Sequence, residues 1–159
     1  MKKFIFTARA FMAASIILVA LFVTSCDDDD NITNDDTYSL SGNGSGSQEV
    51  PSNSSTGAAT LTGTYNASTN MLNYDINWSG LTTASTAIHF HGPALMGVSA
   101  GVLVGLTITT SGVSGRANGT ITLTESQETA LLNGEVYYNI HTATFIDGEV
   151  RGQVITTQN

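Results

Sequence analysis

The chain contains three histidines, and their spacing could bind a metal ion. His89 and His91 are two residues apart in a stretch that alternates like a β-strand, so their side chains share one face. His141 closes a second predicted strand, residues 136–141. Imidazole suits zinc, copper, iron and nickel, and catalytic zinc sites use three protein ligands with one open position. His89, His91 and His141 could therefore form a three-nitrogen site, with Cu or Zn as the cofactor.

The same histidines could instead have a structural role. His89 could orient the turn at Gly92 and Pro93, and His141 could pair with Glu149. Histidine spacing in a sequence often matches a metal-binding pattern in proteins that bind no metal. The sequence therefore leaves both interpretations standing.

Three charged residues could support the histidine ligands. Glu49 and Glu149 are candidates for a fourth ligand or for a group that orients one. Glu149 and Arg151 are two apart and share a strand face, which would allow an ion pair. Arg151 could instead hold a loop or strand end by hydrogen bonds, whereas we expect Arg116, in a Gly- and Ser-rich segment, to be solvated.

Other reactive constellations are missing from the sequence. No serine lies in a Gly-x-Ser-x-Gly elbow, and residues 26–159 contain no lysine for Schiff-base or phosphate chemistry. The segment 42–46 (GNGSG) looks superficially like a phosphate loop, but it lacks the lysine and a following helix, so we expect a flexible turn. No catalytic residue is predicted, and we do not expect an enzyme.

The elements that must position these residues are short strands with period-two alternation, separated by Gly, Asn and Ser clusters. One short helix is predicted after a capping box at Thr124 and Gln127, and it ends at Asn133-Gly134. The pattern favours an all-β Greek-key sandwich or barrel of about eight strands. These strands are Tyr38–Ser41, Ala59–Tyr65, Leu72–Trp78, Ala84–His91, Val102–Thr109, Gly119–Leu123, Val136–His141 and Glu149–Ile155.

The N-terminal segment has the layout of a secretory signal: a basic start, an apolar run over 10–23 and small residues before Cys26. The run has about 14 residues, fewer than the roughly 20 that span a bilayer. Residues 23–26 (VTSC) resemble a bacterial lipobox, which implies removal of 1–25 and lipidation of Cys26, the single cysteine. Residues 26–37 then form an acidic tether, and 38–159 form the β domain. The aspartates at 27–30 either belong to a solvated tether or resemble the surface-export signal of lipoproteins in the Bacteroidetes.

Charge restricts the partners. Removal of 1–25 discards three of the five basic residues and none of the 13 acidic ones, which leaves a net charge of −11. Such a surface repels phosphates, so nucleic acid is excluded as a partner. We expect attachment to a membrane through the lipid on Cys26, at the outer membrane or cell surface.

Eight short motifs together resemble the CHRD domain, named for its occurrence in chordin and common in bacterial secreted proteins. The resemblance covers residues 38–156 and implies no activity by itself. Its His-x-His-Gly-Pro segment is similar to the His-x-His strand of copper/zinc superoxide dismutases, which suggests a related fold and metal site. Dismutase activity is not expected, because that family uses more histidines and a pair of cysteines. The motifs are LSG (40–42), QEVP (48–51), GAA (57–59), WSGL (78–81), AIHFHGP (87–93), LLNG (131–134), YNIHT (138–142) and GEVRGQ (148–153).

Two functions follow from these observations. The first is a lipid-anchored, non-enzymatic module of the cell envelope that binds a protein or a glycan, or has a structural role. The alternative is a metal-binding domain that uses His89, His91 and His141.

Overall fold

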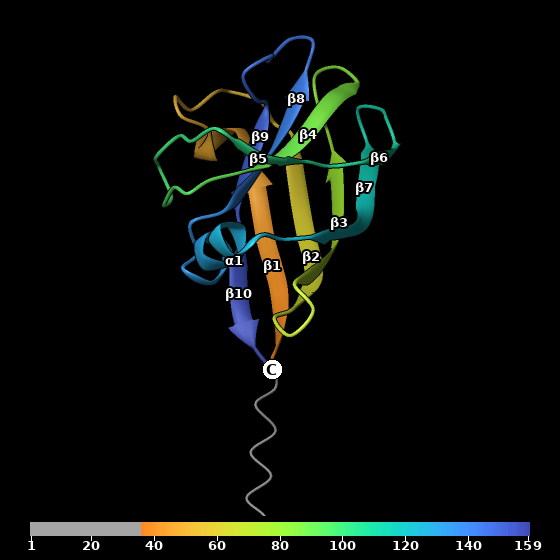
Figure 1. Cartoon of the computed structure of the whole chain (residues 1–159). Coiled ribbons are helices and arrows are strands. Elements are labelled where there is room, and N and C mark those ends of the chain that lie inside the picture. Colours follow the sequence, from red (N-terminus) through yellow and green to blue (C-terminus); the bar gives the residue numbers. More distant parts are fainter. Residues whose placement is uncertain (1–35) are drawn as a thin grey trace, which may run out of the picture. The chain divides into compact units, whose positions relative to one another are not determined.

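The computed structural model describes residues 36–159 (Figure 1). The predicted signal peptide, the lipidation of Cys26 and nearly all of the acidic tether lie outside the described residues. Within the described part of the chain, no helix has the length and apolar character needed to cross a membrane.

The described chain forms ten strands, one α-helix and one short 3₁₀ helix. All strand pairs are antiparallel. The strands are β1 (Thr37–Ser45), β2 (Ala58–Asn66), β3 (Met71–Ser79), β4 (Ser85–His91), β5 (Val102–Gly105), β6 (Ile108–Thr110), β7 (Gly115–Thr122), β8 (Tyr137–Thr142), β9 (Val150–Gln153) and β10 (Ile155–Gln158). The helices are η1 (Gly46–Gln48) and α1 (Glu125–Leu132).

The strands form one sheet in the order β5-β4-β8-β9-β1-β2-β3-β7-β6, and β10 also pairs with β1. Strands β5 and β6 lie at opposite ends of this order, yet only Leu106 and Thr107 separate them in the chain. The sheet must therefore curl until its two edges approach each other, as Figure 1 shows. At the crossing, the Leu106 amide donates to the Ile88 carbonyl at 2.9 Å, and the Thr107 amide donates to the Tyr74 hydroxyl at 3.0 Å.

This curled sheet confirms the all-β prediction, with two strands more than expected. The predicted strand at 102–109 is divided into β5 and β6, which pair with different neighbours. The predicted strand at 149–155 is divided at Val154 into β9 and β10, which both lie along β1. In each case the hydrophobic pattern continues through the break between the two strands, so the alternation of residues predicted one strand where the structure has two.

The core lies inside the curl, and the predicted strand faces are confirmed. Ile88 and Phe90 on β4 are buried on the face opposite the histidines. The α-helix is also confirmed, because the Thr124 hydroxyl caps the Gln127 amide while the Gln127 side chain caps the Thr124 amide. Burial of this apolar surface is the main stabilising contribution. Large residues with almost no exposure include Leu61, Tyr65, Leu72, Ile76, Ile88, Leu131, Tyr138, Ile140 and Val150.

The predicted flexible turn at 42–46 is wrong, because most of that segment continues β1 as far as Ser45. The reason lies in the packing of Tyr138, whose hydroxyl donates to the Ala59 carbonyl at 3.2 Å. A Cβ at Gly44 would lie 2.6 Å from that hydroxyl, and one at Gly152 would lie 2.5 Å from the ring. These glycines therefore make room for an aromatic ring rather than for a turn.

Strand β1 spans the distance between the two ends of the domain. It begins at Thr37, whose carbonyl accepts from the amide of the last residue, Asn159, at 3.1 Å. It ends at Ser45, which is in register with Arg151 on β9. Figure 1 accordingly shows the C-terminus at one end of the domain, while η1 lies at the other.

Candidate metal centre

The structure brings the three predicted histidines together. Strands β4 and β8 are antiparallel neighbours, and Ala87 on β4 is in register with His141 on β8. His89 is therefore diagonal to His141, on the same face of the sheet as His91. One ring nitrogen from each of the three side chains lies within 4.8 Å of the corresponding nitrogen of the other two. Within residues 36–159, these three histidines are the cluster of potential ligand side chains (His, Cys, Asp or Glu) that could hold a metal ion.

Backbone carbonyls orient two of the three rings. The Nδ1 atom of His91 lies 3.1 Å from the Ala100 carbonyl oxygen, and Nδ1 of His141 lies 3.0 Å from the Ile146 carbonyl oxygen. A carbonyl only accepts, so each of these Nδ1 atoms carries a proton and the neutral ring keeps its lone pair on Nε2. This is the arrangement in which protein histidines usually bind metals, with the second nitrogen held by a hydrogen bond.

The remaining ring nitrogens face one another. Nε2 of His141 accepts a hydrogen bond from Nδ1 of His89 at 3.1 Å. Nε2 of His91 is buried and has no hydrogen-bond partner within the described structure. A buried polar atom without a partner costs free energy comparable to its desolvation, about 1–3 kcal/mol. The lone pair on Nε2 of His91 is therefore buried without a hydrogen-bond donor among the described residues.

The electrostatic surroundings keep two of the rings neutral. Burial is the main cause that lowers the pKa of His89, and the neighbouring His141 adds to the effect. Burial likewise lowers the pKa of His91, and it prevails over the hydrogen bond to Ala100, which acts in the opposite direction. A neutral imidazole is the form that can bind a metal, and the lowered pKa values of His89 and His91 favour that form of both rings.

Tyr137 and Arg151 support His91, the most buried of the three histidines. The Tyr137 ring stacks on the His91 ring with centroids 5.0 Å apart. Its hydroxyl lies 3.1 Å from both the amide nitrogen and the carbonyl oxygen of Ala100. The Arg151 guanidinium lies 3.6 Å from the centre of the same ring. It also donates to the Val98 carbonyl at 2.8 Å, so Arg151 holds a loop by hydrogen bonds, one of the two roles predicted from sequence.

Glu149 is fully buried and its carboxylate is committed to three other segments. It accepts hydrogen bonds from the Ser55 hydroxyl, from the amide and hydroxyl of Thr82, and from the Thr142 hydroxyl, at 2.7–2.9 Å. Burial alone would raise the pKa of Glu149, but these four bonds outweigh it and hold the pKa below its usual value. The Glu149 carboxylate is not part of the histidine cluster. It links the segments that contain Ser55, Thr82 and Thr142 through hydrogen bonds.

The alternative pairings of these charged groups are not found. His141 binds the Ile146 carbonyl rather than Glu149. Glu149 and Arg151 do not pair with each other. The ion pair found within residues 36–159 joins Arg116 to Asp75, at 2.6 Å. Arg116 is exposed to solvent, as predicted, and the register of Asn77 with Arg116 also brings it beside Asp75 on β3.

Glu49 approaches the site through Asn139, a residue whose role was not predicted from the sequence. Asn139 is in register with His89, and its side-chain amide donates to Glu49 at 3.4 Å. Burial raises the pKa of Glu49 to about 7, although Arg151 and the Asn139 bond act to lower it. Glu49 is therefore one residue removed from the histidines and is not in the ligand group.

A family model for the CHRD domain matches residues 40–154. The match covers most of the chain and all three histidines, so the chain belongs to the CHRD domain family. Comparisons with curated proteins and with solved structures gave no match.

Proposed function

We propose that this CHRD domain binds a transition metal ion, Cu(II) or Zn(II), through His89, His91 and His141. The observation that carries the proposal is the buried, unpartnered Nε2 of His91 within 4.8 Å of two further imidazole nitrogens. Metal–nitrogen bonds of about 2.0–2.1 Å place tetrahedral ligands about 3.3 Å apart. Nδ1 of His89 and Nε2 of His141, which share a hydrogen bond in this structure, are 3.1 Å apart and so already lie close to that spacing.

Of the two functions that the sequence leaves open, the geometry favours metal binding over a module without chemistry. Three imidazoles would leave one coordination position for water or for another molecule. We assign no reaction to the site, and the role that we propose is binding of the metal at the cell envelope.

The metal proposal is tested on the whole chain, purified in detergent without a histidine tag and equilibrated with Zn(II) or Cu(II). Elemental analysis should find about one ion per chain. The variants His91→Ala and His141→Ala should each lose most of it. Glu125→Ala, which removes an exposed carboxylate from α1, is the matched control and should keep the metal. Substoichiometric metal that does not change in His91→Ala would overturn the proposal.

We further propose that the domain is lipid-anchored through Cys26. The sequence supports this with its basic, apolar and small-residue segments before that cysteine. The chain enters the domain at Thr37, whereas the histidines lie near the other end of β1. Nine residues of strand extend about 26–30 Å. An anchored domain would therefore be held by the end remote from its histidines.

The anchor is tested by mass spectrometry of the protein extracted from membranes. The N-terminal peptide should begin at Cys26 and carry acyl chains. Cys26→Ser should move the protein out of the membrane fraction. An unmodified Cys26 in membrane-extracted protein would contradict the proposal.

A further inference from the structure

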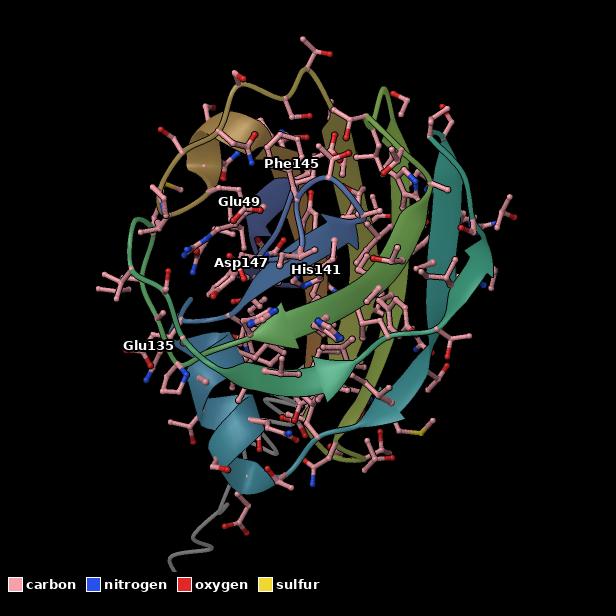
Figure 2. The ribbon with its side chains drawn as sticks, turned by 90° about the horizontal axis from the view of Figure 1, so that it is seen from above. Glu49, Glu135, His141, Phe145 and Asp147 are labelled. Atoms are coloured by element: carbon pink, nitrogen blue, oxygen red, sulfur yellow. The ribbon has the colours of Figure 1, made fainter. Side chains whose placement is uncertain are left out.

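A cavity of about 270 Å³ opens beside the histidines, between two loops. Residues 49–53 form one wall and 144–148 the other. Figure 2 shows Glu49, Phe145 and Asp147 gathered around this region beside His141, while Glu135 lies apart. Pockets for drug-sized ligands usually hold about 300–1,000 Å³. This cavity is therefore suited to one side chain or a similarly small group.

The walls of the cavity are fixed by hydrogen bonds. The side-chain amide of Asn53 donates to the carbonyls of Gly148 and Glu149, at 3.2 and 3.1 Å, and so ties one wall to the other. The second wall is held at the Ile146 carbonyl, which accepts from Nδ1 of His141. A ligand would thus enter a space that already exists, and it would touch a loop that positions a histidine.

One residue that lines the cavity, Glu49, has a polar acceptor without a donor. Oε1 of Glu49 is buried and unpartnered, and so is Oδ1 of Asn139, a side chain that is only 4% exposed. Asn139 lies directly beneath the lining residue Gly148, where an added Cβ would come within 2.4 Å of its amide. Buried acceptors of this kind normally have a partner. The unpartnered acceptor on the lining residue Glu49 favours a ligand that donates hydrogen bonds.

The charge around the cavity selects a cation. The lining residues from 49 to 53 and from 144 to 148 include the acids Glu49 and Asp147 and no base. Of the two arginines of the described chain, Arg116 pairs with Asp75. Arg151 acts on Glu49 only through its charge, because its guanidinium donates its hydrogen bonds to loop carbonyls. Phe145 adds an aromatic wall, and aromatic faces attract ammonium and guanidinium groups.

We infer that this cavity binds the cationic end of a lysine or arginine side chain presented by a partner protein. The carboxylate of Glu49 accepts the hydrogen bonds of the ammonium or guanidinium group, and Asp147 adds charge at the rim. The inference is independent of the metal proposal, because no histidine ligand lines the cavity. It identifies a docking point next to the candidate metal centre.

The test is a titration of the whole, isotope-labelled chain in detergent, without added metal, followed by amide chemical shifts. The probes are the capped tripeptides Gly-Lys-Gly and Gly-Arg-Gly, the neutral Gly-Gln-Gly, and free spermidine. At least one cationic peptide should shift the amides of 49–53 and 144–148 in a saturable way. Glu49→Gln should weaken it about tenfold, as expected for a lost hydrogen bond to a charged group. Glu135→Gln, the same charge change outside the cavity, should leave it within about twofold.

Three results would overturn the inference. The first is equal binding of the neutral and cationic peptides. The second is an unchanged affinity in Glu49→Gln, whose amide spectrum also reports whether the variant is folded. The third is saturation by spermidine with no response to either cationic peptide, which would assign the cavity to a free amine instead of a protein side chain. Since no metal is present, none of these results depends on the histidine proposal.

Discussion

His91 and Tyr137 share a single backbone carbonyl. The imidazole Nδ1 and the phenol hydroxyl both lie 3.1 Å from the oxygen of Ala100, and the two rings stack with an interplanar angle of 10°. The two residues are direct partners across β4 and β8. The loop that contains Ala100 therefore cannot move without disturbing the ring that we propose as the most buried metal ligand.

Tyr137→Phe should weaken metal binding while the fold is kept. The change removes the hydroxyl that holds Ala100 but preserves the ring that stacks on His91. Groups that orient metal ligands typically contribute 10–100-fold to affinity, and we expect a loss near the lower end, about tenfold, because the imidazole keeps its own bond to the carbonyl. Calorimetric titration with Zn(II) measures the effect.

Tyr74→Phe is the matched control for that variant. Its hydroxyl also binds a loop amide, that of Thr107, but its ring lies in the core against Phe90, on the face of β4 opposite the histidines. Tyr74→Phe should lower the free energy of unfolding by about 1 kcal/mol and leave metal affinity unchanged. An equal loss of affinity in both variants would mean that the effect of Tyr137 is a general loosening of the domain.

Glu149→Gln should be strongly destabilising. The carboxylate accepts four hydrogen bonds from Ser55, Thr82 and Thr142. A glutamine amide keeps one acceptor and turns its NH₂ group toward donors, which leaves buried groups unpaired. We expect a loss of about 2–4 kcal/mol in the free energy of unfolding at pH 7, measured in urea. Asp75→Asn, which breaks an exposed ion pair, should cost at most about 1 kcal/mol.

The same carboxylate predicts the response to acid. Its pKa in the fold is lower than the ordinary value of 4.5, so the ionised form is the one that stabilises the fold. This contribution is complete above the ordinary pKa and is lost as pH falls through the lowered one. Stability measured from pH 6 down to pH 2 should drop in the wild type and drop less in Glu149→Gln. Parallel curves would contradict the prediction.

Much of the fold could be predicted because the strands are regular. Alternation on β3 and β4 indicated which side chains face the core, and the pair Thr124 and Gln127 marked the start of α1. Strand ends were harder, since they depend on tertiary contacts. Gly44 resembles a turn residue in sequence, yet it continues β1 because Tyr138 occupies the space where its side chain would be.

The grouping of the three histidines could be predicted from the sequence, but the residues that orient them could not. His-x-His spacing and a third histidine on another strand identified the trio. Tyr137 and Asn139 carry no such signal, because their role follows from loops that fold over β8. Glu149 was expected near the histidines, but its partners Ser55 and Thr82 are distant in sequence, and no local pattern brings them together.

Gly152→Ala should show that the glycines beside Tyr138 are steric requirements. The added methyl would lie 2.5 Å from the tyrosine ring, which is completely buried. Overpacking of this kind costs about 1–3 kcal/mol, measurable by urea denaturation. Gly101→Ala, where the added carbon meets no atom within 4 Å, should change stability by less than about 0.5 kcal/mol. Equal effects would indicate that backbone freedom, rather than space, is what these positions need.

Glu49→Gln should stabilise the domain at alkaline pH and have little effect in acid. Burial raises the pKa of Glu49 from 4.5 to about 7, so the fold favours its neutral form. The free energy of unfolding of the wild type should therefore decrease as pH rises from 4.5 through 7. Glutamine resembles the neutral acid and escapes this penalty. Allowing for partial exposure, we expect a gain of about 1–2 kcal/mol at pH 8 and almost none at pH 4.

Urea denaturation of the wild type, Glu49→Gln and Glu135→Gln at pH 4 and pH 8 tests this prediction. Only the first substitution should flatten the pH dependence, and a destabilised Glu49→Gln at pH 8 would contradict it. A carboxylate that weakens its own fold when ionised needs a compensating partner. Residues of this kind concentrate at binding sites, and a cation in the adjoining cavity would supply that partner. Adding the arginine peptide at pH 8 should therefore raise the stability of the wild type and not that of Glu49→Gln.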